Sequence, residues 1–171
     1  DFKAKIGANA SVQWPAGIGA KGNEGVANMV KQTQGAIGYV EYAYVKQNKM
    51  AYASLVNDAG KTVSPTAESF QAAAANADWS SAPGMYLVVT NQPGDRSWPI
   101  TGASFILMPK EPKDAAAAKT ALAFFDWAYA KGSAMADELD YVAMPAPVQE
   151  QVKALWKASI QSEGKPLWAM N

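Results

Sequence analysis

Gln34-Gly35-Ala36-Ile37-Gly38-Tyr39-Val40-Glu41-Tyr42 is a short apolar run that is framed by glycines and ends in a carboxylate. Nearly continuous apolar character is typical of a strand covered on both faces, as strands of parallel or mixed sheets are. We therefore expect residues 34–42 to form a buried strand inside an α/β layer structure, with the neighbouring segments packed around it.

A glycine-rich loop precedes this strand. Gly17, Gly19 and Gly22 have the spacing of a dinucleotide-binding turn, and Glu41 stands at the end of the following strand, where such folds place an acid on a ribose. With a short strand over 11–14, a helix capped by Asn23 and the strand 34–42, the segment could belong to a nicotinamide- or flavin-dependent oxidoreductase. A tight connection between structural elements is the favoured interpretation, because the first strand is short and polar and Trp14-Pro15 interrupts its path into the turn.

Further elements follow from the pattern of apolar, proline and glycine residues. We expect a short helix over 42–49, a strand over 51–56 that pairs with 61–63 through the turn 57–60, and a helix that Ser64 caps and that ends near Asn76. Residues 85–89 read as a strand or a helical turn, 91–97 as a linker, and 98–108 as a long strand. Three helices complete the chain: one after Asp114, a short one that ends at Leu139, and a last one that carries Val148, Val152 and Trp156 on one face.

Composition limits the chemistry available to this chain. It has 171 residues, 49% of them hydrophobic, and its 15 basic and 15 acidic side chains cancel, so no long-range field gathers nucleic acid. Cysteine and histidine are both absent, which removes disulfides, thiol nucleophiles, zinc sites built from Cys or His, and His-dependent triads. The chain lacks a membrane-spanning apolar segment and does not start with a signal peptide, so we expect a soluble protein whose export signal has been removed.

Other candidate sites are weaker. Asp137, Glu138 and Asp140 could gather a hard cation, although an acidic helix end facing water explains them better. Arg96 is the only arginine and hence the only candidate for a bidentate anion clamp, but a lone arginine in a Pro-Gly turn is more often solvated. Trp127 and Trp156 fall on helical faces and read as core rather than as sugar-stacking platforms. We expect no catalytic and no metal-binding residue.

Several segments have a distinctive amino-acid sequence. They are Trp14-Pro15-Ala16-Gly17-Ile18-Gly19-Ala20-Lys21-Gly22-Asn23-Glu24-Gly25, Gly35-Ala36-Ile37-Gly38-Tyr39-Val40-Glu41-Tyr42-Ala43-Tyr44, Trp98-Pro99-Ile100-Thr101, Phe105-Ile106-Leu107, Phe125-Asp126-Trp127-Ala128-Tyr129, Leu139-Asp140-Tyr141 and Gly164-Lys165-Pro166-Leu167. In combination they closely resemble the periplasmic phosphate-binding proteins of high-affinity phosphate ABC transporters, and the resemblance covers nearly all of the chain.

This resemblance implies a type II periplasmic-binding-protein fold, in which two α/β sandwich lobes close on phosphate. Family members are longer, and their phosphate ligands lie upstream of the point where this chain begins: Ser and Thr residues, an Asp, and an Arg followed by a Ser-Gly-Thr helix start. None of these motifs occurs here, so no ligand-binding residue can be assigned, and Arg96 is not promoted to the role. The chain resembles the C-terminal half of the family.

The resemblance also implies a division into lobes. Residues 1–97 would be the C-terminal part of the second lobe, and residues 98–171 the return into the first lobe, with helices from 113 to 160 packed there. The crossover would be residues 91–100, with Ser97, Trp98 and Pro99 as the hinge. The linker over 91–97, found from composition alone, falls at the same place.

The function implied by the resemblance is physical capture of inorganic phosphate, without a cofactor. Backbone N–H groups at helix N-termini and hydroxyls would hold the anion, while a buried carboxylate would accept the proton that phosphate keeps and sulfate lacks. The implied partners are phosphate, the membrane permease of the transporter and the N-terminal half of the same protein, with no nucleic acid. The implied location is the bacterial periplasm.

Overall fold

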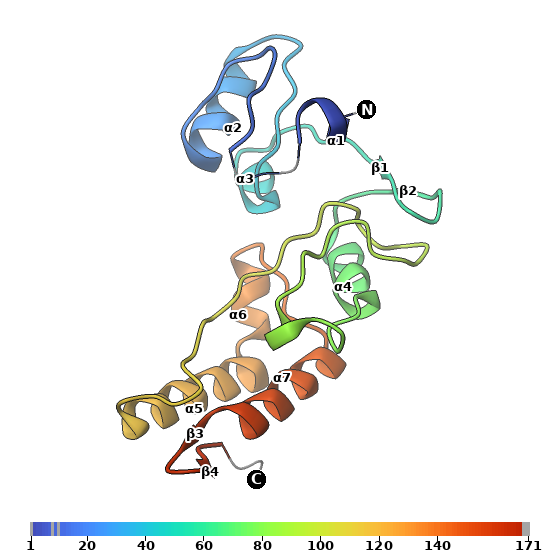
Figure 1. Cartoon of the computed structure of the whole chain (residues 1–171). Helices are drawn as coiled ribbons and strands as arrows, with labels where there is room; N and C mark the ends of the chain where they lie inside the picture. Colours follow the sequence, from blue (N-terminus) through green and yellow to red (C-terminus); the bar gives the residue numbers. More distant parts are fainter. Residues whose placement is uncertain (1, 8, 10, 169–171) are drawn as a thin grey trace. The chain divides into compact units, whose positions relative to one another are not determined.

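A computed structural model describes residues 2–7, 9 and 11–168 of the chain (Figure 1). It consists of two compact units, Asp1–Ala51 and Tyr52–Asn171, each of which has its own local architecture. No helix formed by the described residues is both long and apolar enough to cross a membrane.

The first unit is helical. It contains α1 (Phe2–Lys5), α2 (Gly22–Gln32) and α3 (Tyr42–Gln47), of which α3 confirms the helix expected after Glu41. Asn23 does not cap α2, because the helix begins at Gly22 and Lys21 occupies the cap position without a side-chain hydrogen bond. The Asn23 side chain instead accepts a hydrogen bond from the Glu41 backbone N–H, with a nitrogen–oxygen distance of 2.9 Å, and so joins the first turn of α2 to the residue that precedes α3.

The buried strand predicted over 34–42 is wrong. Residues 36–41 form no strand, and the side chains of Ile37 and Tyr39 are 92% and 72% exposed. A strand needs a neighbour that accepts its hydrogen bonds and covers its side chains, and no other described segment pairs with this one. Gly38 lies directly against α2, since a Cβ atom there would come within 2.8 Å of Val30 Cγ2.

The second unit opens with the predicted hairpin. β1 (Leu55–Val56) and β2 (Thr62–Val63) pair in antiparallel fashion, with Leu55 opposite Val63. Helix α4 (Ala67–Asn76) starts later than predicted, because Thr66 rather than Ser64 caps it. Thr66 Oγ1 accepts from the Ser69 N–H at 3.2 Å, and Ser69 Oγ accepts from the Thr66 N–H at 2.9 Å, so the two residues form a reciprocal capping box.

Residues 86–108 contain little regular structure. A 3₁₀ turn, η1 (Pro83–Met85), leads into them, and a single antiparallel bridge joins Thr90 to Ile100. The long strand predicted over 98–108 is therefore wrong, as a strand requires a continuous partner and the described residues supply one bridge only.

Three helices and a hairpin complete the second unit. The three helices were predicted from the apolar periodicity. The elements are α5 (Ala115–Lys131), α6 (Ser133–Glu138), α7 (Ala146–Ser159), β3 (Gln161–Ser162) and β4 (Lys165–Pro166), with β3 and β4 antiparallel. Asp114 caps α5 by accepting a hydrogen bond from the Ala117 N–H at 2.9 Å.

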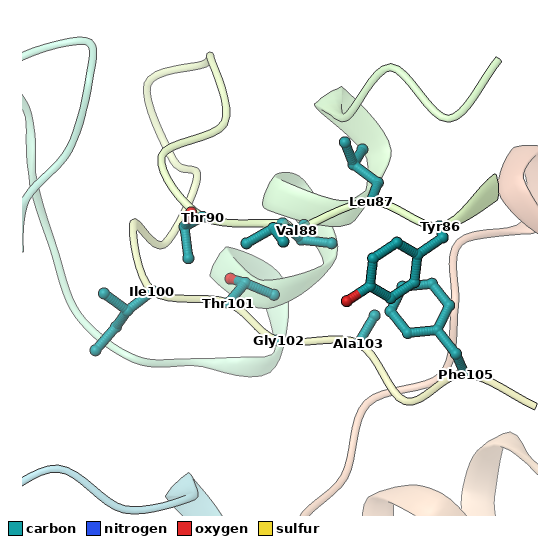
Figure 2. Close-up of a pocket in the computed structure, with 10 residues that line it drawn as sticks. Tyr86, Leu87, Val88, Thr90, Ile100, Thr101, Gly102, Ala103 and Phe105 are labelled. Atoms are coloured by element: carbon teal, nitrogen blue, oxygen red, sulfur yellow. The ribbon is translucent and has the colours of Figure 1, made fainter. Parts of the chain in front are cut away.

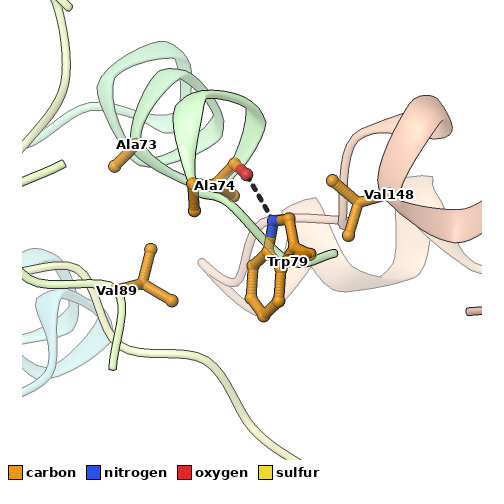
Figure 3. Close-up of a cluster of buried hydrophobic side chains, with 6 residues drawn as sticks. Ala73, Ala74, Trp79, Val89 and Val148 are labelled. Atoms are coloured by element: carbon orange, nitrogen blue, oxygen red, sulfur yellow. Dashed lines mark hydrogen bonds between the residues drawn. The ribbon is translucent and has the colours of Figure 1, made fainter. Parts of the chain in front are cut away.

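One apolar cluster joins α4 to α7. Its buried members are Ala73, Ala74, Ala77, Trp79, Val89 and Val148. In Figure 3 the Trp79 indole lies between α4 and Val148 of α7, and its Nε1–H donates to the Ala74 carbonyl at 2.7 Å. The indole is 3% exposed, so this bond satisfies a polar group that would otherwise be buried without a partner.

A second cluster holds α5 against α7, which lie side by side in Figure 1. Leu122 and Trp156 are buried in it, and the Trp156 ring stacks on Tyr129 with centroids 5.8 Å apart. Trp156 is thus a core residue, as predicted. Trp127 is not: its side chain is 47% exposed, because it lies on the part of α5 that α7 does not cover.

Candidate functional site

The segment predicted as the crossover begins with a tight turn. Asn91 and Gly94 have positive φ angles of 52° and 106°, a region that glycine adopts without strain and asparagine tolerates. The Ser97 N–H donates to the Gly94 carbonyl at 3.2 Å, and Ser97 Oγ donates to the Pro93 carbonyl at 2.6 Å. A side chain at Gly94 would collide with the amide nitrogen of Asn76 and would have to displace that side chain, in addition to adopting the positive φ angle.

Asn57, the first residue of the β1–β2 turn, clamps the crossover turn. Its side chain is buried and its Nδ2 lies 3.0 Å from the Gly94 carbonyl, 3.1 Å from that of Asp95 and 3.2 Å from that of Ser97. Its Oδ1 accepts from the Lys61 N–H at 2.9 Å. The Asn57 side chain therefore joins the β1–β2 turn to the crossover turn, and all of its partners are backbone groups.

The three predicted hinge residues are attached to α4 and to this turn. Ser97 is fully buried, and its Oγ accepts from Asn76 Nδ2 at 3.1 Å. The Trp98 N–H donates to the Ser69 carbonyl at 3.1 Å, and the Pro99 carbonyl accepts from the Asn91 N–H at 2.8 Å. The backbone of residues 97–99 is thus held on both sides, and whether it acts as a hinge stays a prediction.

The Trp98 ring strengthens the attachment to α4. It is 6% exposed and meets the Phe70 ring edge-on, with centroids 6.2 Å apart. Such an arrangement contributes about 0.5–1.5 kcal/mol beyond the burial of the rings themselves. The crossover is therefore anchored by packing as well as by hydrogen bonds.

Arg96 lies beside this turn, at the surface. It contributes to a shallow depression of about 230 Å³, lined also by Thr62, Val63, Ser64, Thr66, Glu68, Ser69 and Asp95. The pKa of Glu68 is lowered, first by a hydrogen bond from its own backbone N–H, then by the Thr66 hydroxyl and more weakly by the charge of Arg96. Two carboxylates thus oppose one guanidinium here, which disfavours an anion and agrees with leaving Arg96 without a ligand role.

The glycine fingerprint lacks the structure that a dinucleotide needs. Residues 11–21 and 36–41 form no strand, so Gly17, Gly19 and Gly22 are not held between two strands of a βαβ unit. The Glu41 N–H is bonded to Asn23. Gly17 and Gly22 do have positive φ angles, which shows why the loop uses glycine without invoking a ligand.

The acidic residues near the end of α6 form no metal centre. Within residues 2–7, 9 and 11–168, no three acidic side chains come together in a way that could hold a metal ion. Asp137 and Glu138 lie in the last turn of α6, and Asp140 follows it with a φ angle of 63°. The helix-end interpretation therefore fits these residues.

Asn57 and Asn76 are site residues that the sequence did not single out. Asn57 was expected to begin a turn, which it does, but its carbonyl partners lie 37, 38 and 40 residues further along the chain. The sequence signal was limited to the turn motif Asn57-Asp58-Ala59-Gly60.

A comparison with family models defines the class of protein. Residues 7–132 match the PBP superfamily domain, which is well over half of the chain. The chain therefore belongs to the PBP superfamily, and the predicted α/β periplasmic-binding-protein fold class is confirmed.

Several individual relatives that match the chain share one name. The chain is 52% identical over 169 residues to the phosphate-binding protein PstS of Pasteurella multocida, a match that covers 98% of this chain and 49% of the relative. The proteins of the same name from Xylella fastidiosa strain Temecula1 and Haemophilus influenzae are 53% and 50% identical over 161 residues, covering 44% and 48% of their lengths. The resemblance to phosphate-binding proteins is confirmed, and the chain spans about half the length of the curated relatives it matches.

Proposed function

We propose that this chain is the C-terminal half of the phosphate-binding subunit of an ABC importer. The observation that carries the proposal is identity of 50–53% to proteins named for phosphate binding, over 94–98% of the chain. The glycine loop that could have favoured a dinucleotide enzyme has no strand on either side within residues 11–21 and 36–41, so geometry adds no support for the alternative.

The phosphate ligands belong, in this proposal, to the half that the chain does not span. The one arginine lies in a depression that also holds Glu68 and Asp95, and phosphate would be repelled by both carboxylates. We therefore expect the 171-residue chain to bind phosphate weakly by itself. Its role would be to complete the two lobes and, through residues 91–100, to connect them.

The proposed protein is a carrier rather than an enzyme. Its mechanism is closure around an anion, which requires neither a cofactor nor a nucleophile, and the absence of cysteine and histidine is compatible with that. Capture would take place in the periplasm, followed by delivery to the membrane permease of the transporter. The proposed function does not involve nucleic acid, and the balanced charge of the chain agrees with this.

Equilibrium titration by calorimetry tests the proposal. The 171-residue chain and a fusion of it to the part of the Pasteurella multocida relative outside the match are each titrated with phosphate, sulfate and NAD. We expect saturable phosphate binding by the fusion alone, with no response to sulfate or NAD. An Arg96→Gln fusion should bind phosphate as the parent does.

Three outcomes would contradict this assignment. Saturable NAD binding without phosphate binding would restore the oxidoreductase built on Gly17, Gly19, Gly22 and Glu41. Micromolar phosphate affinity in the isolated chain would show that it carries its own ligands. Loss of affinity in the Arg96→Gln fusion would make that arginine one of them.

A further inference from the structure

The crossover turn, residues 93–97, directs three backbone carbonyl groups at one side chain. The oxygens of Gly94, Asp95 and Ser97 lie 3.0, 3.1 and 3.2 Å from Asn57 Nδ2. A primary amide has two hydrogens to donate, so the three oxygens engage both of them. This nitrogen therefore has no hydrogen left for a ligand, and any effect that it has on binding must pass through the turn.

The β1–β2 hairpin holds Asn57 in the orientation that the turn needs. The Asn57 N–H donates to the Lys61 carbonyl at 2.9 Å, and the Asn57 carbonyl accepts from the Gly60 N–H at 2.9 Å. The side-chain Oδ1 accepts from the Lys61 N–H, also at 2.9 Å. Exchanging the two amide atoms would place an oxygen against three carbonyl oxygens, so the hydrogen-bond network determines which atom faces the turn.

The loop that contains the turn is also closed at its base. Figure 2 shows Thr90 and Ile100 opposite each other, where an antiparallel bridge joins them. The Asn91 N–H donates to the Pro99 carbonyl at 2.8 Å. Beyond the bridge, the two arms of the loop line an open depression of about 390 Å³. The loop 91–99 is therefore restrained at its base as well as at its tip.

We propose that Asn57 is a positioning residue for phosphate capture, because its amide keeps the crossover turn in the geometry from which the two lobes close. A protein that closes around its ligand binds it only in the fraction of molecules whose connecting segment has a suitable geometry, and the apparent dissociation constant rises as that fraction falls. Without the two donated hydrogens the turn would sample further conformations. This inference rests on the proposed function and on residues 91–100 as the crossover.

The variant Asn57→Asp isolates the two donated hydrogens. An aspartate has nearly the same shape and can still accept from the Lys61 N–H, but its carboxylate has no hydrogen for the turn carbonyls. Asn57→Ala removes the donor without adding a charge, and it decides the question if Asn57→Asp does not fold. Gln92→Ala is the matched control, since Gln92 lies in the same loop and makes an exposed hydrogen bond to the Thr90 carbonyl.

Calorimetric titration with inorganic phosphate tests the inference. The parent is the fusion of the 171-residue chain to the unmatched part of the Pasteurella multocida relative, and each variant is made in that fusion. We expect the dissociation constant to rise at least about tenfold in both Asn57 variants, with an unchanged number of phosphates bound, and to stay within about twofold in Gln92→Ala. Each variant is titrated at a temperature at which circular dichroism shows it to be folded, so that lost stability alone does not raise the constant.

Hydrogen exchange of the same fusions without phosphate reports on the turn itself. The Ser97 N–H donates to the Gly94 carbonyl and the Trp98 N–H to the Ser69 carbonyl, so both amides are protected while the turn keeps its conformation. We expect these two amides to exchange at least about tenfold faster in the Asn57 variants, and the amides of α7 to exchange as in the parent. Saturating phosphate should restore most of the protection, because the closed protein selects the original geometry.

Four results would overturn the inference. Unchanged affinity in Asn57 variants whose turn exchanges faster would show that the geometry of the turn does not determine affinity. Unchanged exchange would show that the amide does not position the turn. Equal weakening in Gln92→Ala would assign the effect to the loop surface. A parent fusion that binds no phosphate would reject the proposed function and this inference with it, whereas the other three results leave the proposed function standing.

Discussion

At the scale of single residues, the buried amide of Asn57 determines the conformation of the crossover turn. Its nitrogen lies within 3.2 Å of three carbonyl oxygens from residues 94, 95 and 97. The bond to the Ser97 carbonyl is buried and the other two are partly buried, so loss of this donor would leave carbonyls that are wholly or partly shielded from water without a partner. The turn is therefore stable only in the presence of a residue from another loop.

Asn57→Ala should lower the free energy of unfolding by about 2–4 kcal/mol, since it leaves one buried and several partly buried polar groups without a partner. Urea denaturation followed by tryptophan fluorescence measures the change. Gln92→Ala is the control: Gln92 makes one exposed hydrogen bond, to the Thr90 carbonyl, and its removal should cost within about 0.5 kcal/mol. Equal effects of the two variants would show that the clamp contributes little.

The sequence predicted which residues form the two turns, but not the hydrogen bonds between the turns. The motifs Asn57 to Gly60 and Pro93-Gly94 predicted turns correctly, because turn preferences depend on a residue and its immediate neighbours. The hydrogen bonds that join these turns span 37 or more residues. A single sequence contains no signal for such a pairing, which is why Asn57 and Asn76 were missed.

At the scale of elements, the α5–α7 pair combines buried rings with a partly exposed ion pair. Lys153 Nζ lies 3.0 Å from Asp126 Oδ1 and 3.7 Å from Glu150 Oε1. The hydrogen bond that Lys153 donates to Asp126 is the main reason why the pKa of Lys153 is raised above 10.5. Burial raises the pKa of Tyr129 above 10.0, against a weaker opposing effect of the Lys153 charge.

These shifts predict that stability falls at alkaline pH. Both groups hold their protons more tightly in the folded protein, so their contribution is fully present below the unfolded pKa values of 10.0 and 10.5 and is lost as the pH rises through the higher folded values. The urea midpoint should be constant from about pH 8 to about pH 9.5 and should decrease by about pH 11.

Two variants separate the contributions. Tyr129→Phe keeps the ring that stacks on Trp156 but removes the ionisable hydroxyl, and Asp126→Asn removes the main cause of the Lys153 shift. Each should flatten part of the alkaline decrease, and the double variant should flatten most of it. A double variant whose midpoint falls as steeply as that of the parent would assign the decrease to other groups.

Helices were predicted better than strands, for a physical reason. The hydrogen bonds of α5 and α7 connect residues four apart, so capping residues and apolar spacing within each segment suffice to predict them. A strand is defined by a partner elsewhere in the chain. The runs 34–42 and 98–108 have strand composition, but the described residues provide no partner strand for the first and a single bridge for the second, and Ile37 and Leu107 remain exposed.

At the scale of the whole molecule, two boundaries must be distinguished. The chain passes from the first compact unit to the second between Ala51 and Tyr52. The predicted lobe crossover, 91–100, lies inside the second unit. The first boundary is flanked by exposed residues without regular structure at 51–54. The second is held by Asn57, Asn76 and α4. Local opening should therefore be easier near residue 51 than near residue 97.

Limited digestion with trypsin distinguishes the two segments, because each has an exposed cleavage site: Lys49 beside the first and Arg96 within the second. Cleavage requires the backbone to open, so we expect the bond after Lys49 to be cut first, with fragments identified by intact mass. Asn57→Ala should advance cleavage after Arg96, and Gln92→Ala should not. Early cleavage after Arg96 in the unmodified chain would instead show that the turn opens freely, as a flexible hinge at residues 97–99 requires, and would contradict the restraint that the hydrogen bonds of Asn57 imply.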